Sequence, residues 1–292
     1  MSNTVEIIDN IDNINNIIDI KNNLYLNCRN LNDSNQFMNL VKKSKIKILE
    51  NNGCYNPNLL FCEFCCYGKL QNIIEYLNYE NDIDPFFNNL IAFKYACNCK
   101  NLIVANWLHN LQVKHSENNI KYYEEAFINA CSYNNIDIVK WLYNINNDLI
   151  NSIINNRAFG MSCNYGSELP MWLYSKNNNI NVSYNNESAF KLALSKNNIQ
   201  LAEWLLSINP NIIVNIDDEE PFAKICSCAN LDTVKWFLKK YPDTNIEADN
   251  FKAFKYACGF YMNPNPIVAK WLVEIRPDIL NYNDLVEMYK NM

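Results

Sequence analysis

The stretch that decides the fold is residues 92–97, AFKYAC, followed ten residues after Cys97 by Trp107-Leu108. Phe93 and Cys97 are four residues apart, so on a helix they lie on the same face. A polar pair, Lys100-Asn101, separates this segment from the one that carries the tryptophan. The stretch therefore predicts two short helices joined by a polar turn.

The same two landmarks recur in step along the chain. Tryptophans follow one another at intervals of 34, 31, 32, 32 and 35 residues, and Tyr76 extends the series upstream. They are Trp107, Trp141, Trp172, Trp204, Trp236 and Trp271. A Phe lies four residues before a Cys or Leu at Phe93-Cys97, Phe127-Cys131, Phe159-Cys163, Phe190-Leu194, Phe222-Cys226 and Phe254-Cys258. Helices this short are unstable alone, so the repeat predicts a solenoid whose units bury their apolar faces against one another.

The second helix of each unit and its end are also visible. Ile136, Val139 and Leu142 have the spacing of a buried helical stripe, which Trp141 flanks. Proline follows such segments at Pro210, Pro242 and Pro277, where it ends the helix, and the neighbouring Asn and Asp residues suit a turn. A two-helix unit of this length with a turn-rich connector indicates the ankyrin period of about 33 residues.

At these residues the chain resembles the ankyrin-repeat family, and more narrowly the divergent repeats that giant DNA viruses of amoebae encode. The residues that carry the resemblance best are Ala253-Phe254, Ala257-Cys258, the IVAKWL of residues 267–272 and Arg276-Pro277-Asp278. The Thr-Pro-Leu-His stretch of other ankyrin repeats is replaced, as at residues 91–94, so we expect the histidine that ties adjacent repeats together to be missing throughout. Asn mostly stands where Gly precedes the second helix, and Asn also tolerates the left-handed conformation.

The predicted fold class is an all-α, ankyrin-type repeat solenoid of about seven helix-turn-helix units with helical caps. The repeats are expected at 55–85, 86–119, 120–151, 152–182, 183–214, 215–246 and 247–281. Residues 1–54 are expected to form an Asn-rich segment, weakly ordered over 1–23, and a capping helix over 35–50 that carries Phe37, Leu40, Val41 and Ile48. Residues 282–292 are expected to form a C-terminal capping helix.

Composition and charge narrow the range of possible binding partners. The net charge is −6, with acidic and basic residues interspersed and no run of Lys or Arg longer than two. Because a phosphate-binding surface needs clustered positive charge, we expect no nucleic-acid partner. Asn makes up about a fifth of the chain, which we attribute first to AT-rich codons and only second to chemistry.

The start of the chain, MSNTVEIIDN, lacks the pattern of a secretory signal, and no stretch reaches the 18 or so apolar residues of a membrane span. We therefore expect no membrane partner and a cytoplasmic protein, in the host cell if the chain is viral. In that compartment the twelve cysteines are expected to be free thiols.

Cysteine clusters raise the alternative of a metal site. Cys62, Cys65 and Cys66 lie close in sequence, as do Cys97 and Cys99. However, a repeat position that needs a small buried residue holds Cys66, Cys97, Cys131, Cys163, Cys226 and Cys258. We favour core packing over a metal site, since zinc usually takes two pairs of ligands brought together by a loop.

Catalysis is not expected. The chain has only His109 and His115, of which we expect His109 to be a helix-end residue, and no Gly-rich phosphate loop. We also expect no cofactor. The tryptophan and phenylalanine series could form a stacking platform for bases, but its fixed repeat phase favours core packing.

Binding residues are expected where the ankyrin resemblance places them, at connector tips and first-helix ends. The tips offer Phe87, Asn88, Tyr122, Tyr184, Asn185, Asp217 and Asp249. The helix ends offer Asn98, Cys99, Ser132, Tyr133, Asn164, Tyr165, Lys196 and Phe260. Tyr122, Tyr133, Tyr165 and Tyr184 are expected to form an uncharged aromatic patch suited to a protein interface, the alternative being that some of them cover neighbouring helices.

These residues lead to one hypothesis with two alternatives. The hypothesis is a monomeric, non-enzymatic scaffold that binds a protein partner on a concave face and acts on host proteins as a viral interaction factor. The first alternative is a substrate adaptor for ubiquitin ligation with residues 1–55 as its recruiting arm. The second is a metal- or redox-responsive protein that uses the cysteines between Cys62 and Cys99.

Overall fold

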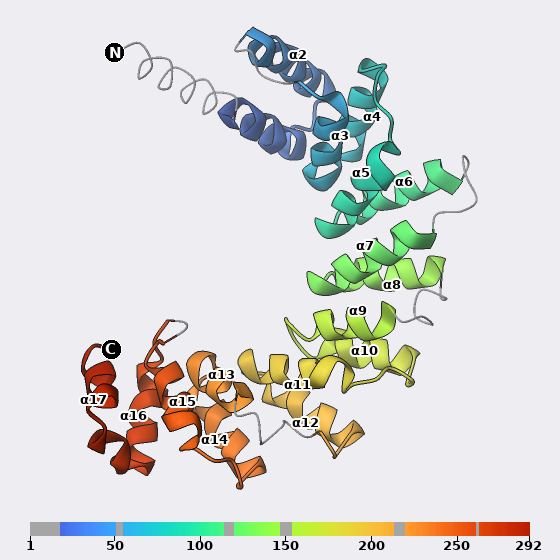
Figure 1. The fold of residues 1–292 in the computed structure, drawn as a ribbon. Helices are drawn as coiled ribbons and strands as arrows, with labels where there is room; N and C mark the ends of the chain where they lie inside the picture. The colour runs from blue at the N-terminus through green and yellow to red at the C-terminus, as the bar shows by residue number, and fades with distance from the viewer. Residues whose placement is uncertain (1–17, 51–54, 114–119, 147–153, 213–219, 261–262) are drawn as a thin grey trace, which may run out of the picture. The chain divides into compact units, whose positions relative to one another are not determined.

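The computed structural model describes residues 18–50, 55–113, 120–146, 154–212, 220–260 and 263–292. Every element of regular structure in these ranges is a helix (Figure 1). Short helices follow one another in pairs, and the first helix of one pair packs against the first helix of the next, as α3 does against α5 and α13 against α15. The chain therefore has an all-α, repeat-like fold, as its sequence predicts.

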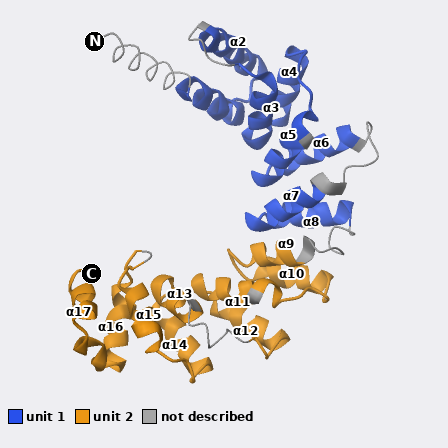
Figure 2. Ribbon diagram, viewed as in Figure 1, with its two compact units in different colours: residues 1–149 blue, residues 150–292 orange. Residues whose placement is uncertain are grey.

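The chain divides into two compact units, Met1–Leu149 and Ile150–Met292 (Figure 2). In the first unit the helix pairs are residues 18–30 with α2 (Ser34–Glu50), α3 (Pro57–Tyr67) with α4 (Leu70–Tyr79), α5 (Phe87–Asn98) with α6 (Leu102–Val113), and α7 (Ile120–Ser132) with α8 (Ile136–Ile145). In the second they are α9 (Ile154–Ser162) with α10 (Glu168–Lys176), α11 (Tyr184–Ser195) with α12 (Ile199–Ile208), α13 (Glu220–Cys228) with α14 (Leu231–Lys240), and α15 (Ala248–Ala257) with α16 (Pro266–Ile275). A 3-10 helix, η2 (Pro277–Asn281), and α17 (Asn283–Lys290) close the chain.

The first helices bury the predicted landmark residues. All six landmark phenylalanines are at most 3% exposed: Phe93, Phe127, Phe159, Phe190, Phe222 and Phe254. The Cys or Leu four residues later is also buried in each, except that Cys258 is half-buried. The prediction that this position packs in the core is confirmed, and the side chains share one helix face because they are four residues apart.

The tryptophans, expected to pack in the core, are less deeply buried than the phenylalanines. All six are half-buried, whereas the Leu or Val residues beside them, such as Val139 and Leu142, are buried. Each of three tryptophans instead pairs with the Phe of an earlier helix pair: Phe93 with Trp141, Phe159 with Trp204 and Phe190 with Trp236, with ring centroids 6.1, 6.3 and 6.4 Å apart. Tryptophan therefore covers the Phe of a neighbouring pair and keeps one edge at the surface.

Asparagine at the turn between paired helices adopts the expected left-handed conformation. Asn134 has a φ of 53° and Asn197 a φ of 59°. The following residues, Asn135 and Asn198, donate their backbone N–H to Ala130 and Ala193, five residues earlier, both at 2.8 Å. These bonds close a Schellman-type end on the first helix, in which Asn replaces the usual Gly.

A second asparagine at this turn ties neighbouring pairs together. The Asn135 side chain donates through Nδ2 to the carbonyl oxygens of Cys97 and Asn98, at 2.9 and 2.8 Å, at the end of the preceding first helix. Asn101 makes the same two-carbonyl bridge to Cys65 and Gly68, and Asn265 makes it to Cys226 and Ala229. At this position, therefore, the asparagine amide has a specific structural role, because it satisfies helix-end carbonyls.

The N-terminal region contains an additional helix. Residues 18–23, expected to be weakly ordered, belong to a helix over 18–30 whose Leu24 and Cys28 are fully buried. These two residues repeat the four-residue spacing of the landmark pair, and Asn72 bridges to the carbonyl oxygens of Cys28 and Leu31. The predicted capping helix is α2, with Phe37, Val41 and Ile48 buried. Residues 1–17 lie outside the described residues.

One pair of cysteines departs from the expectation of free thiols. Cys66 of α3 and Cys99, which follows α5, form a disulfide, and their Cα atoms are 5.2 Å apart. That separation is normal for the bond. Cys99 does not occupy the repeated core position, so only the packing of α3 against α5 brings it to Cys66. Nine other cysteines in the described ranges are free.

Gly68 gives a direct test of how closely the helix of residues 18–30 packs. A Cβ atom at Gly68 would meet the Cys28 Sγ and would lie 2.6 Å from the backbone oxygen of Phe64. We expect Gly68→Ala to lower the free energy of unfolding by about 1–3 kcal/mol, because backbone must shift to relieve this overlap. Gly166, where a Cβ meets nothing within 4 Å, is the matched control. Urea unfolding followed by circular dichroism measures both; equal midpoints would contradict the packing.

Candidate functional site

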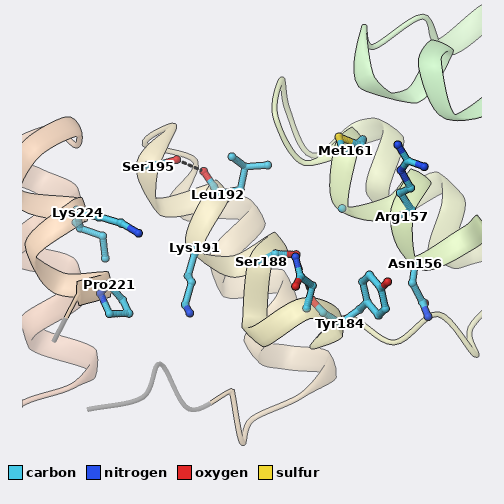
Figure 3. A pocket seen from close by; sticks show the side chains of 13 residues that line it. Asn156, Arg157, Met161, Tyr184, Ser188, Lys191, Leu192, Ser195, Pro221 and Lys224 are labelled. Carbon is cyan, nitrogen blue, oxygen red and sulfur yellow. Dashed lines mark hydrogen bonds between the residues drawn. The ribbon is translucent and has the colours of Figure 1, made fainter. Parts of the chain in front are cut away.

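A groove of about 630 Å³ crosses three successive first helices of the second unit, α9, α11 and α13 (Figure 3). It is lined by Asn156, Arg157, Gly160, Met161, Tyr184, Asn185, Ser188, Lys191, Leu192, Ser195, Pro221, Lys224 and Ile225. A volume of this size falls in the range of sites that bind ligands or short peptide segments.

The groove is hollow because two of its residues are small. Gly160 directly follows the landmark Phe159, a position that Lys94 and Ile128 fill in the first unit. A Cβ at Gly160 would meet only the Ser188 Oγ, at 3.8 Å. Ser188 turns its hydroxyl back onto its own helix, where it donates to the Tyr184 carbonyl oxygen at 3.1 Å. Small side chains on facing helices therefore leave the space open.

The lining is positively charged. Its charged members are Arg157, Lys191 and Lys224, one from each helix, and none of the described residues in the lining carries a carboxylate. The nearby Glu187 of α11 lies close to Tyr241, whose pKa burial and, secondarily, this carboxylate raise to about 12. A basic groove thus occurs in a chain whose net charge is −6.

The structure places two predicted binding residues, Tyr184 and Asn185, in this lining. Asn88, Tyr133, Tyr165, Lys196, Asp249 and Phe260 are exposed, and Phe87, Asn98, Ser132 and Asn164 are half-buried. Asp217 and the side chain of Tyr122 lie outside the described residues. Since Tyr133 belongs to the first unit and Tyr165 and Tyr184 to the second, the single aromatic patch stays a prediction.

Residues predicted to lie at connector tips belong to helices, not to loops. Phe87 and Tyr184 are the first residues of α5 and α11. The residues after them, Asn88 and Asn185, have left-handed φ angles of 47° and 56°, and Asp249 in the equivalent position of α15 has one of 50°. Asn and Asp tolerate this region better than other residues with a side chain. These positions therefore form a tight left-handed start to α5, α11 and α15.

The basic part of the groove is not apparent from the sequence. Arg157, Lys191 and Lys224 stand at three different distances from their landmark phenylalanines, at two residues before, one after and two after. Only the packing of α9, α11 and α13 brings them to one surface. The sequence feature that could have indicated an open groove here is Gly160, one of only five glycines in the chain.

His109 has a different role from the one expected. It lies inside α6, and its Nδ1 is hydrogen-bonded to the Tyr123 hydroxyl of α7 at 2.6 Å. Its ring also packs edge-on against Trp141 of α8, with centroids 5.8 Å apart. The expectation that it is a helix-end residue is wrong. His109 also links two adjacent helix pairs, although it does not stand at the histidine position of the Thr-Pro-Leu-His stretch. His115 lies outside the described residues.

His109 predicts a pH effect on stability. Burial lowers its pKa below the ordinary value of 6.5, so the unfolded chain takes up the proton first. The stability that the neutral ring contributes is complete above pH 6.5 and is lost as the pH falls through the folded-state pKa. Wild type should therefore lose more stability than His109→Gln between about pH 7.5 and pH 5.5 in urea unfolding, since glutamine does not titrate. Equal losses would contradict this role.

The buried thiols are poorly suited to nucleophilic chemistry. Burial raises the pKa of Cys97 and Cys131 far above the ordinary range and that of Cys163 to about 12. A thiol that stays protonated is a weak nucleophile and a weak metal ligand. Within the described residues, no group of three or more His, Cys, Asp or Glu side chains is placed to hold a metal ion.

Comparisons with known proteins do not assign the chain to a family, so it is described by its all-α, repeat-like fold. A scan against family models, a search of curated proteins and a search of solved structures each find no match. In the ranges that the structure describes, no helix combines the length and apolar character needed to cross a membrane.

Proposed function

We propose that the chain is a non-enzymatic scaffold of ankyrin type that binds a protein partner at the exposed C-terminal ends of its first helices. One observation carries the proposal. Tyr133, Tyr165 and Phe260 stand two residues after the landmark Cys of their repeats and are 55%, 61% and 58% exposed. Exposed aromatic side chains are common anchors at protein interfaces, and these three share one position of the repeat.

The rest of the proposal follows from the sequence. The resemblance of residues 253–278 to repeats of giant DNA viruses favours a viral factor that acts on a host protein in the host cytoplasm. The net charge of −6 argues against nucleic acid as the partner. We propose a monomer, in which rigid display of side chains replaces bond chemistry.

Affinity capture from host-cell extract tests this function. The bait proteins are wild type, Tyr133→Ala/Tyr165→Ala and the control Ile103→Ala/Ile267→Ala, which removes exposed apolar side chains from the second helices α6 and α16. We expect wild type and control to recover the same partner and the tyrosine variant to recover about tenfold less. Recovery of the same partner in equal amount by all three, or of none reproducibly, would overturn the proposal.

The disulfide between Cys66 and Cys99 favours a second candidate, a redox-responsive protein. In that case oxidation would link α3 covalently to the end of α5, and reduction would break that link. Thiol titration of unfolded, unreduced protein purified from the cytoplasm decides: two thiols fewer than the twelve cysteines support this candidate, and a full set argues against it.

A further inference from the structure

The groove across α9, α11 and α13 has the features of a specific binding site. Its three cationic side chains come from three successive helices, and they are separated by polar and apolar residues, among them Tyr184, Met161 and Leu192 (Figure 3). We infer that the groove binds an extended, acidic protein segment with a carboxylate at every third residue. This inference rests on the proposed function and names the chemistry of one part of the partner.

The spacing of the helices determines the spacing of the carboxylates. Axes of packed helices lie about 8–10 Å apart, so we expect Arg157, Lys191 and Lys224 to follow one another at intervals of about that size across the groove. A polyproline II segment rises about 3.1 Å per residue with three residues per turn, so its every third side chain points the same way at intervals of about 9 Å. A β-strand alternates its faces at every residue and would turn every second such carboxylate away.

The uncharged residues that line the groove suit the peptide residues that lie between its carboxylates. Tyr184 is 43% exposed and Met161 is 37% exposed, so both offer accessible apolar surface to alanine or proline. Proline-rich extended segments dock on aromatic side chains in this manner, because their conformation is already ordered before binding. The opening at Gly160 and Ser188 lets the peptide backbone approach α9 and α11.

Fluorescence anisotropy with a defined peptide tests the inference on the full chain. The probe is a fluorescein-labelled peptide of three Glu-Ala-Pro repeats. One control peptide has Gln in place of each Glu, and a second has the same composition with its three Glu residues consecutive. We expect the probe to bind at least about tenfold more tightly than either control, because three modest ion pairs together give a factor of this order.

Two triple variants locate the binding. Arg157→Ala/Lys191→Ala/Lys224→Ala should weaken probe binding by about tenfold or more, whereas Lys239→Ala/Lys270→Ala/Lys290→Ala should change it less than about twofold. The second variant removes the same charge from exposed positions of the same unit. Matching circular dichroism spectra and urea midpoints establish that both variants fold.

Equal binding of the Glu and Gln peptides, or equal weakening by the two variants, would overturn the inference. The proposed function would stand in that case if the capture experiment still recovers a tyrosine-dependent partner. If capture also fails, the proposed function falls with it, so the two failures can be told apart.

Discussion

Asn135→Asp is expected to destabilise the first unit by about 3–5 kcal/mol, among the largest effects of any single substitution in this chain. Asn135 is 2% exposed, and its Nδ2 is the donor to the carbonyl oxygens of Cys97 and Asn98. A carboxylate there would have no proton to donate. It would also lie against two oxygens at the C-terminal, negative end of α5.

The neighbouring Asn134 supplies the matched control. Asn134→Asp makes the same chemical change at a half-buried residue in the left-handed turn, which Asp tolerates, so we expect a change of about 0.5 kcal/mol or less. Urea unfolding of wild type and both variants gives the comparison. The cost of Asn135→Asp should shrink as the pH falls, because a protonated carboxyl can again donate one hydrogen bond. Equal stability of the two variants would show that the bridge between pairs is unimportant.

Phe190→Ala is expected to cost about 3–5 kcal/mol in the second unit, since it deletes a large buried side chain and leaves a cavity. Phe190 is fully buried, and its ring lies 6.4 Å from that of Trp236 and 6.3 Å from that of Tyr241. The control is Tyr165→Ala, which truncates an aromatic residue that is 61% exposed and should cost less than about 0.5 kcal/mol. Thermal or urea unfolding measures both, and similar losses would contradict the assigned core.

Much of this fold could be predicted because the landmarks are local. The four-residue spacing of Phe and Cys, and the prolines after Ile208, Lys240 and Ile275, locate helices and helix ends from neighbours in sequence. The helix over 18–30 could not be predicted because its single Leu24-Cys28 pair is not distinct among the Asn, Asp and Ile residues around it. Helix formation there depends on burial against the following pair, which local pattern does not reveal.

Features that join one pair to the next could not be predicted. The asparagine bridges, the His109–Tyr123 hydrogen bond and the Cys66–Cys99 disulfide each connect residues 14 to 44 positions apart. The high asparagine content indicates codon bias when the sequence is read alone, although one asparagine in each of several turns has specific hydrogen-bond partners. The groove likewise depends on which side chains of α9, α11 and α13 face one another.

The central claim is that, within a unit, each helix pair is stabilised by the next through aromatic contacts, which leaves the first-helix ends to a partner. A double-mutant cycle on Phe190→Leu and Trp236→Leu tests it most directly. We expect a coupling energy of about 0.5–1.5 kcal/mol for this pair and a coupling near zero for Phe190 with Trp271, one helix pair further on. Additive effects for Phe190 and Trp236, or equal coupling in both cycles, would contradict the account.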